Sequence, residues 1–322
     1  MRAIVQDHYG APDVLELRDV DRPAIGPGEV LVRVHAAGID QGVWHLMAGL
    51  PYVVRLGYGM RTPKNPVRGL DVAGEVEQVG AQVTRFRPGD EVFGTCAGSF
   101  AEYASAREDR LARMPATLGF EEAAVVATSG YAALQAVRDR ARVQAGQRVL
   151  VIGAGGGVGT FAVQIARAYG AQVTGVASTA KIDLVRSIGA DEVIDYTVED
   201  FVDRPDRYDA ILDLAGNRPL SRLRRALTPN GTLVIVGGEG GGRWLGGVDR
   251  QLRARLLSPF VGQSLQTCFS SERPEDLEEL RRLIEAGDLA PVIDRAFPLS
   301  AVPDAIRYLR AGRPRGKTVI TV

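Results

Sequence analysis

A glycine-rich loop near the middle of the chain has the residues best suited to chemistry. Residues 152–159 read Ile-Gly-Ala-Gly-Gly-Gly-Val-Gly and join an apolar segment at 148–152 to a helical pattern at 160–169. Glycine lets the backbone approach a phosphate group closely, and the free N–H groups at a helix N-terminus bind one. The strict G-x-G-x-x-G register is not met, and from residue 154 the pattern is Ala-x-Gly-x-x-Gly.

A strand, a glycine loop, a helix and a second strand within about 30 residues are typical of a dinucleotide-binding unit. The loop therefore predicts a site for the pyrophosphate of a cofactor. The alternative is a glycine-rich turn without a ligand. The expected cofactor contacts are Ala154, Gly156, Gly157, Val158 and Gly159.

The end of the second strand distinguishes two forms of such a cofactor. An NAD site places Asp or Glu there, because a carboxylate accepts hydrogen bonds from the ribose 2′-hydroxyl. Residues 177–181 instead read Ala-Ser-Thr-Ala-Lys, without a carboxylate. Hydroxyl groups and an ammonium group suit a 2′-phosphate, so we expect NADP(H), bound by Ser178, Thr179 and Lys181. The alternative for Lys181 is a solvated residue near the start of a helix.

Strands and helices alternate from about residue 119 onward. The segments expected to form strands are continuous apolar runs. Such runs indicate a parallel sheet covered on both faces, and hence a doubly wound α/β domain. The expected strands are 148–152, 173–177, 193–195, 210–213 and 232–236, with helices at 160–169 and 182–188.

Residues 1–118 have a β-rich pattern, with Gly and Pro at short intervals that indicate a small barrel or sandwich. Strands are expected at 29–35, where valines alternate with other residues, and at 72–79. Residues 43–68 are apolar without a clear period, which predicts a long loop acting as a lid or pocket wall, or else a surface flap. The chain ends with expected helices at 274–286 and 301–311 and strands near 291–294 and 318–322.

Charge and composition exclude several classes of protein. The chain has 39 basic and 39 acidic residues, a balance that argues against a general polyanion binder. Two cysteines and three histidines are too few for a disulfide framework or a cysteine-rich zinc module. No apolar run reaches the roughly 18 residues of a membrane helix, and the N-terminal run is too short for a signal peptide. We expect a cytoplasmic protein that binds neither nucleic acid nor membranes.

Further segments carry a recognisable pattern, among them Pro-Gly-Glu-Val-Leu-Val-Arg-Val at 27–34 and Gly-Leu-Asp-Val-Ala-Gly-Glu-Val at 69–76. Similar matches occur at 86–94, 98–103, 189–196 and 316–319. With the glycine loop, they resemble the medium-chain dehydrogenase/reductase superfamily, and within it the zinc-independent quinone oxidoreductase branch. The resemblance covers nearly the whole chain. It implies an α/β protein with a GroES-like β-barrel catalytic domain (1–118 and 271–322), an inserted Rossmann domain (119–270) and an active site in the cleft between them.

The activity implied by the resemblance is NADPH-dependent reduction of quinones or α,β-unsaturated carbonyls. Zinc enzymes of this fold bind their catalytic zinc at positions that correspond here to Asp40, Leu70 and Val125. Leu and Val cannot bind zinc, so no metal is expected. Two alternatives are a zinc-free NADPH alcohol dehydrogenase or ketoreductase and a non-enzymatic NADPH-binding protein.

The resemblance also implies roles around the cofactor. Thr128, Gly237 and Gly238 would hold the nicotinamide carboxamide, and Tyr196 would pack near the adenosine. Lys317 falls where the family often has a basic residue close to the cofactor. The alternatives are packing at the edge of the core for Tyr196 and a surface strand position for Lys317.

The resemblance also suggests which residues supply the proton that completes the reduction. Tyr52 resembles a tyrosine found near the substrate in quinone oxidoreductases, and Tyr58 or solvent are alternatives. Asp40 stands where this branch usually has Asn, and either relays a proton or anchors His45 or a ribose hydroxyl. Trp44, His45 and Tyr58 are expected to line the substrate pocket, and the alternative for Trp44 and His45 is structural packing.

A homodimer is also expected. Quinone oxidoreductases commonly pair through Rossmann edge strands, and the candidate edge here lies between about 253 and 269, where Leu256-Leu257 and Phe260-Val261 are apolar. The alternative is that these residues form a sixth strand and its internal packing.

Overall fold

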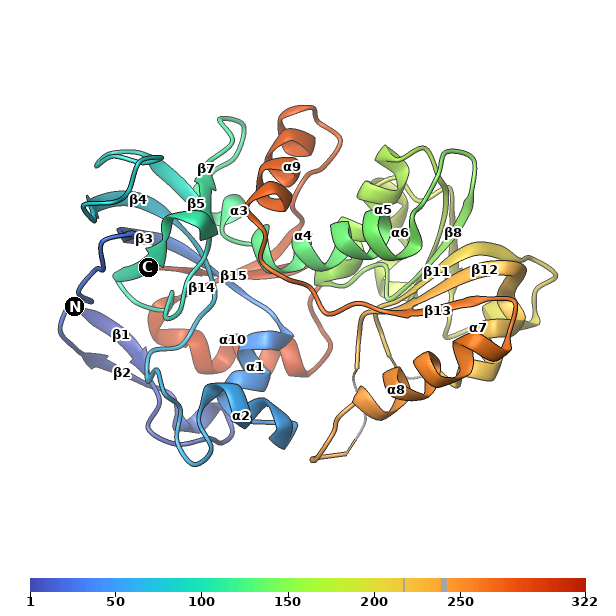
Figure 1. The fold of residues 1–322 in the computed structure, drawn as a ribbon, viewed down its shortest axis with the longest axis horizontal. Coiled ribbons are helices and arrows are strands. Elements are labelled where there is room, and N and C mark those ends of the chain that lie inside the picture. Colours follow the sequence, from blue (N-terminus) through green and yellow to red (C-terminus); the bar gives the residue numbers. More distant parts are fainter. Residues whose placement is uncertain (217, 239–241) are drawn as a thin grey trace. The chain divides into compact units, whose positions relative to one another are not determined.

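The computed structural model describes residues 1–216, 218–238 and 242–322 (Figure 1). Contacts divide the chain into two units. Unit 1 consists of Met1–Ser129, Glu272–Gly287 and Pro291–Val322, and unit 2 of Gly130–Ser271 and Asp288–Ala290. The chain first passes from unit 1 to unit 2 after Ser129, whereas the domain boundary predicted from the sequence follows residue 118.

Unit 2 contains a six-stranded sheet in which every pairing is parallel. The strands are β8 (Arg148–Ile152), β9 (Gln172–Ala177), β10 (Glu192–Asp195), β11 (Tyr208–Asp213), β12 (Leu227–Ile235) and β13 (Ser264–Thr267). Their order across the sheet is β10-β9-β8-β11-β12-β13. Counted within the unit this is 3-2-1-4-5-6, the order of a dinucleotide-binding Rossmann fold. The predicted doubly wound domain is confirmed.

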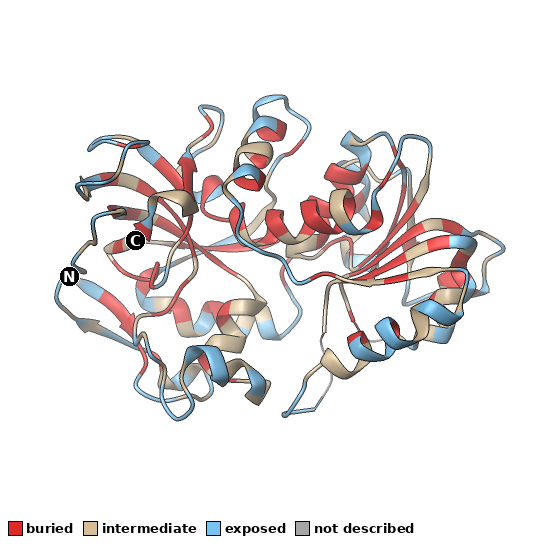
Figure 2. Ribbon diagram, viewed as in Figure 1, coloured by how far each residue is buried: buried red, intermediate tan, exposed pale blue. Residues whose placement is uncertain are grey.

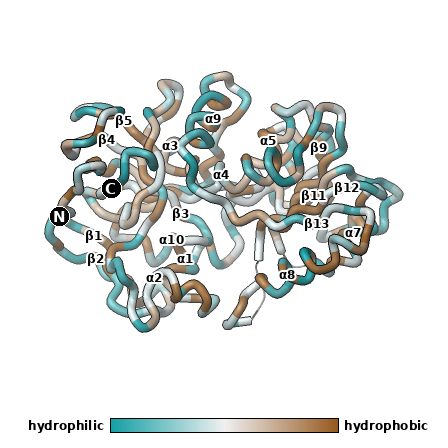
Figure 3. The backbone as a smooth tube through the Cα atoms, in the orientation of Figure 1, coloured by the Kyte–Doolittle hydropathy of each residue, from teal (hydrophilic) through white to brown (hydrophobic). Residues whose placement is uncertain are grey.

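Helices cover both faces of this sheet. α5 (Gly157–Ala168) and α6 (Ile182–Ser187) lie on one side, and α7 (Leu220–Ala226) and α8 (Val248–Leu257) lie on the other (Figure 1). The strands between them are largely buried, and β11 and β12 are strongly hydrophobic (Figures 2 and 3). Burial on both faces explains why these strands are continuous apolar runs.

Unit 1 is built on a mostly antiparallel sheet, ordered β14-β15-β3-β4-β5-β7, with β6 paired to β3 and a separate β1-β2 ribbon. The central strands are β3 (Glu29–Ile39), β4 (Asp71–Val79), β5 (Glu91–Thr95) and β15 (Lys317–Thr321). The others are β1 (Arg2–Val5), β2 (Glu16–Asp19), β6 (Tyr103–Arg107), β7 (Leu111–Arg113) and β14 (Ile293–Pro298). The helices are α1 (Gln41–Ala48), α2 (Arg55–Tyr58), α3 (Phe120–Ala123), α9 (Pro274–Glu285) and α10 (Val302–Arg310), and α4 (Ala127–Leu134) begins here and continues into unit 2.

The prediction of one long loop over 43–68 is wrong in two places, because α1 covers its start and the turn Tyr52–Val54 with α2 (Arg55–Tyr58) lies in its middle. The side chain of Asp40 accepts a hydrogen bond from the Val43 amide and caps α1 (Gln41–Ala48). Gly49 then ends the helix with a φ of 59°, a conformation that glycine adopts without strain. Capping residues at both ends thus define a helix that its weak apolar period did not reveal.

The register of the central strands gathers polar residues at one edge of the sheet. Asp71 pairs with Gly38 on one side and with Thr95 on the other. Thr318 pairs with Ile39. The end of β3, the start of β4, the end of β5 and the start of β15 therefore lie together. This edge carries Asp40, Asp71, Cys96 and Lys317.

No helix among residues 1–216, 218–238 and 242–322 is long and apolar enough to cross a membrane.

Candidate functional site

The glycine loop connects β8 directly to α5 in unit 2. Gly156 caps the helix, and the Thr160 amide donates to the Gly156 carbonyl at 3.0 Å. The amides of Gly157 and Val158 precede that bond, so they are oriented as donors at a helix N-terminus. A Cβ on Gly159 would lie 2.1 Å from the Gly153 oxygen. The helix thus packs against the loop with no room for a side chain, and the backbone donors fit a pyrophosphate.

The side chain of Lys181 lies against this loop. A Cβ built on Gly155 would be 2.9 Å from both Cβ and Cδ of Lys181. Ser178 immediately follows β9 and precedes the turn Thr179–Lys181. The structure thus brings the predicted 2′-phosphate ligands and the predicted pyrophosphate loop to the same end of the sheet.

A carboxylate also lies beside these residues, so the expectation that none is available there is wrong. Asp195 ends β10 and is paired with Ala177 at the end of β9. Its carboxylate accepts a hydrogen bond from the Thr179 hydroxyl at 2.5 Å and another from Thr197. The hydrogen bond from Thr179, followed by the one from Thr197, lowers the pKa of Asp195. Finding this residue required the strand order, because it comes from the neighbouring strand.

The remaining residues predicted to bind the cofactor in unit 2 also follow strand ends. Tyr196 follows β10, is 53% exposed, and donates its amide proton to the Ala177 carbonyl. Gly237 and Gly238 follow β12, and a Cβ on Gly237 would lie 2.1 Å from the Leu214 oxygen. Because all six strands are parallel, these loops share the carboxyl edge of the sheet, where ligands of doubly wound folds bind.

The polar edge of unit 1 contains a buried carboxylate that the sequence analysis did not assign. Asp71 is fully buried, and its Oδ1 accepts hydrogen bonds from the amide of Thr128, at 3.0 Å, and from the hydroxyl of the same residue. Lys317 donates to the Ser129 hydroxyl at 2.9 Å, and its Nζ lies 3.9 Å from Asp71 Oδ2. The Lys317 side chain is 1% exposed, so the surface alternative for this residue is wrong.

Burial dominates the electrostatics of this edge. It raises the pKa of Asp71 to about 7, against the lowering effect of the Lys317 ammonium, while Asp40 raises that pKa further. Burial, together with the charge of Asp71, raises the pKa of the Cys96 thiol to about 12. Asp71 therefore changes charge close to neutral pH. An Asp at the head of β4, directly before the buried residues 72–74, is the sequence signal that could have identified it.

The predicted residues of α1 have structural partners. Asp40 caps the helix through Oδ1, and its Oδ2 is buried with no hydrogen-bond partner among the described residues. A ring nitrogen of His45, Nδ1, lies 2.7 Å from the Leu50 carbonyl oxygen. The guanidinium of Arg310 stacks 3.8 Å from the centre of the Trp44 ring. These contacts favour the packing alternative for Trp44 and His45.

Tyr52 contacts an arginine that the sequence analysis did not single out. The Arg55 guanidinium lies 4.8 Å from the centre of the Tyr52 ring and 4.5 Å from that of Tyr9. Arg55 also donates to the Gly49 carbonyl at 2.9 Å, which ties these rings to the end of α1. Tyr58 is 52% exposed at the end of α2. Tyr52 is thus the better fixed of the two tyrosines.

The three positions that the resemblance matches to zinc ligands do not suit a zinc ion. Leu70 and Val125 carry no ligating atom, and Asp40 uses one carboxylate oxygen to cap α1. Over the described ranges, no group of three His, Cys, Asp or Glu side chains is close enough to hold a metal.

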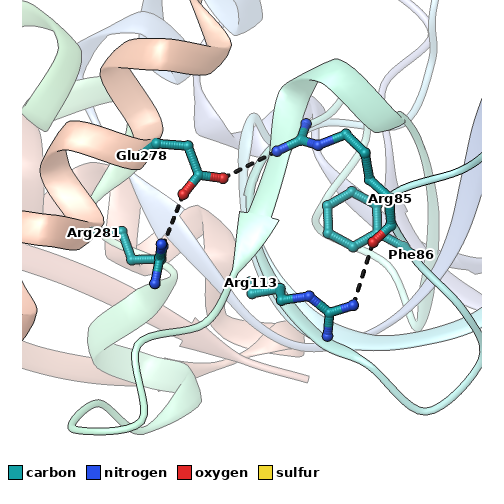
Figure 4. Close-up of a pocket in the computed structure, with 5 residues that line it drawn as sticks. All are labelled: Arg85, Phe86, Arg113, Glu278 and Arg281. Carbon is teal, nitrogen blue, oxygen red and sulfur yellow. Dashed lines mark hydrogen bonds and ion pairs between the residues drawn. The ribbon is translucent and has the colours of Figure 1, made fainter.

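A separate pocket of about 300 Å³ lies between the barrel and α9, within unit 1 (Figure 4). Arg85 and Arg281 both donate to Glu278, at 3.0 and 2.8 Å. Arg113 donates to Asp90 at 2.9 Å. Each guanidinium that lines the pocket is therefore bonded to a carboxylate. The Arg85–Glu278 pair joins the barrel to α9, whereas the Arg281–Glu278 pair lies within α9 and the Arg113–Asp90 pair within the barrel.

Two family descriptions match the chain. Residues 26–116 match the alcohol dehydrogenase GroES-like domain, and residues 188–320 match the zinc-binding dehydrogenase family. A human quinone oxidoreductase is 34% identical over 318 residues, which cover 95% of this chain and 92% of the human protein. The chain belongs to the medium-chain dehydrogenase/reductase superfamily, in its quinone oxidoreductase-like branch.

Other members of this superfamily match over the whole chain. A tomato (Solanum lycopersicum) 2-methylene-furan-3-one reductase is 33% identical over 337 residues, covering 99% of this chain and 79% of the tomato protein. The solved structure of a quinone oxidoreductase from Coxiella burnetii superimposes with a TM-score of 0.85 at 30% identity, covering 100% of this chain and 99% of that one. This medium-chain dehydrogenase/reductase is therefore an oxidoreductase, and its family indicates a nicotinamide cofactor.

Proposed function

We propose that the protein is an NADPH-dependent reductase of quinones or α,β-unsaturated carbonyls that works without zinc. The observation that carries the proposal is that Leu70 and Val125, at positions that the resemblance matches to zinc ligands, have side chains that cannot bind zinc. Without a Lewis acid, a simple carbonyl is a poor hydride acceptor. A conjugated acceptor needs less help, because its negative charge spreads over an enolate or a hydroquinone. The names of the human and tomato relatives support this class of acceptor.

The cofactor assignment to NADPH rests on Lys181, whose side chain lies along the phosphate loop at Gly155. A bound nicotinamide would supply the hydride. In this proposal the amides at the start of α5 bind the pyrophosphate, and Ser178 and Lys181 bind the 2′-phosphate. Thr128 and Lys317 hold the nicotinamide end of the cofactor. Tyr52 donates the proton that completes the reduction.

A panel of acceptors tests the proposal. We expect the protein, containing well under one zinc per chain by elemental analysis, to oxidise NADPH with a quinone or an enone but not with an unconjugated ketone. Turnover of the ketone would favour a zinc-free ketoreductase instead. Tight NADPH binding without turnover of any acceptor would favour a non-enzymatic NADPH-binding protein. A stoichiometric zinc required for activity would contradict the metal-free part of the proposal.

We also propose a homodimer that forms through the β13 edge of unit 2. β13 is the last strand of its sheet, and Leu256 and Phe260 beside it are 64% and 84% exposed. Their neighbours Leu257 and Val261 pack instead against the core of the unit. Leu256 lies on α8 and Phe260 in the turn that follows it, beside a strand whose outer edge is unpaired among the described residues, and an unpaired edge favours pairing with another strand. Light scattering at micromolar concentration should give twice the chain mass of 34.5 kDa. A value near the chain mass would refute the dimer.

A further inference from the structure

Asp71 is the most unusual buried group in unit 1. Its carboxylate is fully buried, yet Oδ2 has no hydrogen-bond partner among the described residues, and the nearest cation, Lys317 Nζ, is 3.9 Å away. Burying a carboxylate and an ammonium group is costly unless their partners are well arranged. The arrangement here requires an explanation beyond packing.

The partners of Asp71 suggest that explanation. Oδ1 accepts both the amide and the hydroxyl of Thr128, in the first turn of α4. A carboxylate at a helix N-terminus also stabilises the helix dipole. The next residue, Ser129, accepts a hydrogen bond from Lys317. The Asp71 carboxylate on β4 therefore fixes the Thr128 hydroxyl on α4. It also places a negative charge beside the Lys317 ammonium group on β15.

We propose that Asp71 is a positioning residue of the nicotinamide site, acting through Thr128 and Lys317. This inference rests on the proposed function, in which those two side chains hold the nicotinamide end of the cofactor. Asp71 itself touches no substrate in this scheme. It keeps the Thr128 hydroxyl in one orientation and keeps Lys317 against Ser129.

The charge of Asp71 should make NADPH binding depend on pH, which a purely structural role of this residue would not do. Its pKa is raised to about 7 by burial and by Asp40 and lowered by Lys317, and Cys96 is the other titratable group beside it. At pH 6 the wild-type carboxyl is mostly protonated and resembles asparagine. At pH 8 it is mostly ionised and balances Lys317.

The experiment compares cofactor dissociation constants of the wild type and Asp71→Asn at the two pH values. The asparagine retains an acceptor for Thr128 and removes only the charge. We expect Asp71→Asn to weaken NADPH binding by about tenfold at pH 8 and by less than about twofold at pH 6. At each pH, the dissociation constant of the variant is divided by that of the wild type, which removes the effect of the cofactor's own titration. Asp276→Asn, which changes a buried Asp on α9, is the matched control and should change neither value.

A double variant keeps the inference testable if Asp71→Asn fails to fold. Asp71→Asn combined with Lys317→Met removes both charges of the pair, so neither is left buried without the other and the variant should fold. If Asp71 acts through Lys317, the double variant should bind NADPH within about twofold of Lys317→Met alone. A further tenfold loss in the double variant would overturn the inference.

Other outcomes separate this inference from the proposed function. Native NADPH affinity in Asp71→Asn at both pH values, or an equal loss at both, would overturn the positioning role alone. A wild-type protein that binds NADPH but reduces no conjugated acceptor would overturn the proposed function, and the dissociation constants would still decide the role of Asp71. A wild type that binds no nicotinamide cofactor would overturn both.

Discussion

Replacing Tyr52 with phenylalanine is expected to lower kcat by at least about 100-fold while leaving the dissociation constant of NADPH unchanged. Donation of a proton by a positioned acid typically contributes about 10²- to 10⁴-fold to a rate. Phenylalanine keeps the aromatic ring that contacts Arg55, 4.8 Å away, so the segment should retain its conformation. The loss would therefore report on the hydroxyl rather than on packing. Stopped-flow measurement of NADPH oxidation with a conjugated acceptor is the assay.

Tyr58→Phe is the matched comparison, because Tyr58 comes from the same segment but is 52% exposed. It should keep near-native kcat. Asp40→Asn tests the other predicted proton carrier, and asparagine still caps α1. If Tyr52→Phe and Asp40→Asn both keep near-native kcat, neither side chain is the donor. Protonation would then come from water, and catalysis would rest on positioning of the hydride and the acceptor.

The backbone features of this fold were the most predictable. The strands of unit 2 are buried on both faces, so their apolar runs marked β8, β9 and β11 to within a residue or two. The glycine loop was equally clear, since Gly159 has no room for a side chain. The start of α1 was missed because it depends on the side chain of Asp40, a capping contact that periodicity does not detect.

Contacts between side chains from distant segments were not predictable. Asp71 and Lys317 come from opposite parts of the chain and meet only because β3 lies between β4 and β15 in the sheet. Asp195 reaches Thr179 only because β10 pairs with β9. A single sequence gives the strands but not which of them are neighbours. The sequence could therefore suggest that Thr179 faces a phosphate but not that a carboxylate lies beside it.

The Asp195 carboxylate beside Thr179 makes Lys181 the decisive residue to test for cofactor preference. Lys181→Ala is expected to weaken NADPH binding by about 10- to 150-fold, because a hydrogen bond to a charged group is worth about 1.5–3 kcal/mol. NADH lacks the 2′-phosphate, so its dissociation constant should barely change. Isothermal titration with both cofactors measures the two effects on the same protein. Arg186→Ala removes an exposed cation on the adjoining helix α6 and serves as the control, with no expected effect.

Asp195 acts in the opposite direction at the same site. Its pKa is lowered by the hydrogen bond from Thr179, so it is ionised at neutral pH and would repel a 2′-phosphate bound in the proposed site. Asp195→Asn should therefore strengthen NADPH binding, whereas Lys181→Ala weakens it. If Lys181→Ala weakened NADH as much as NADPH, the lysine would support the shape of the loop at Gly155 rather than bind a phosphate. If the wild type bound NADH more tightly than NADPH, Asp195 would outweigh Lys181, and the preference for NADPH would be wrong.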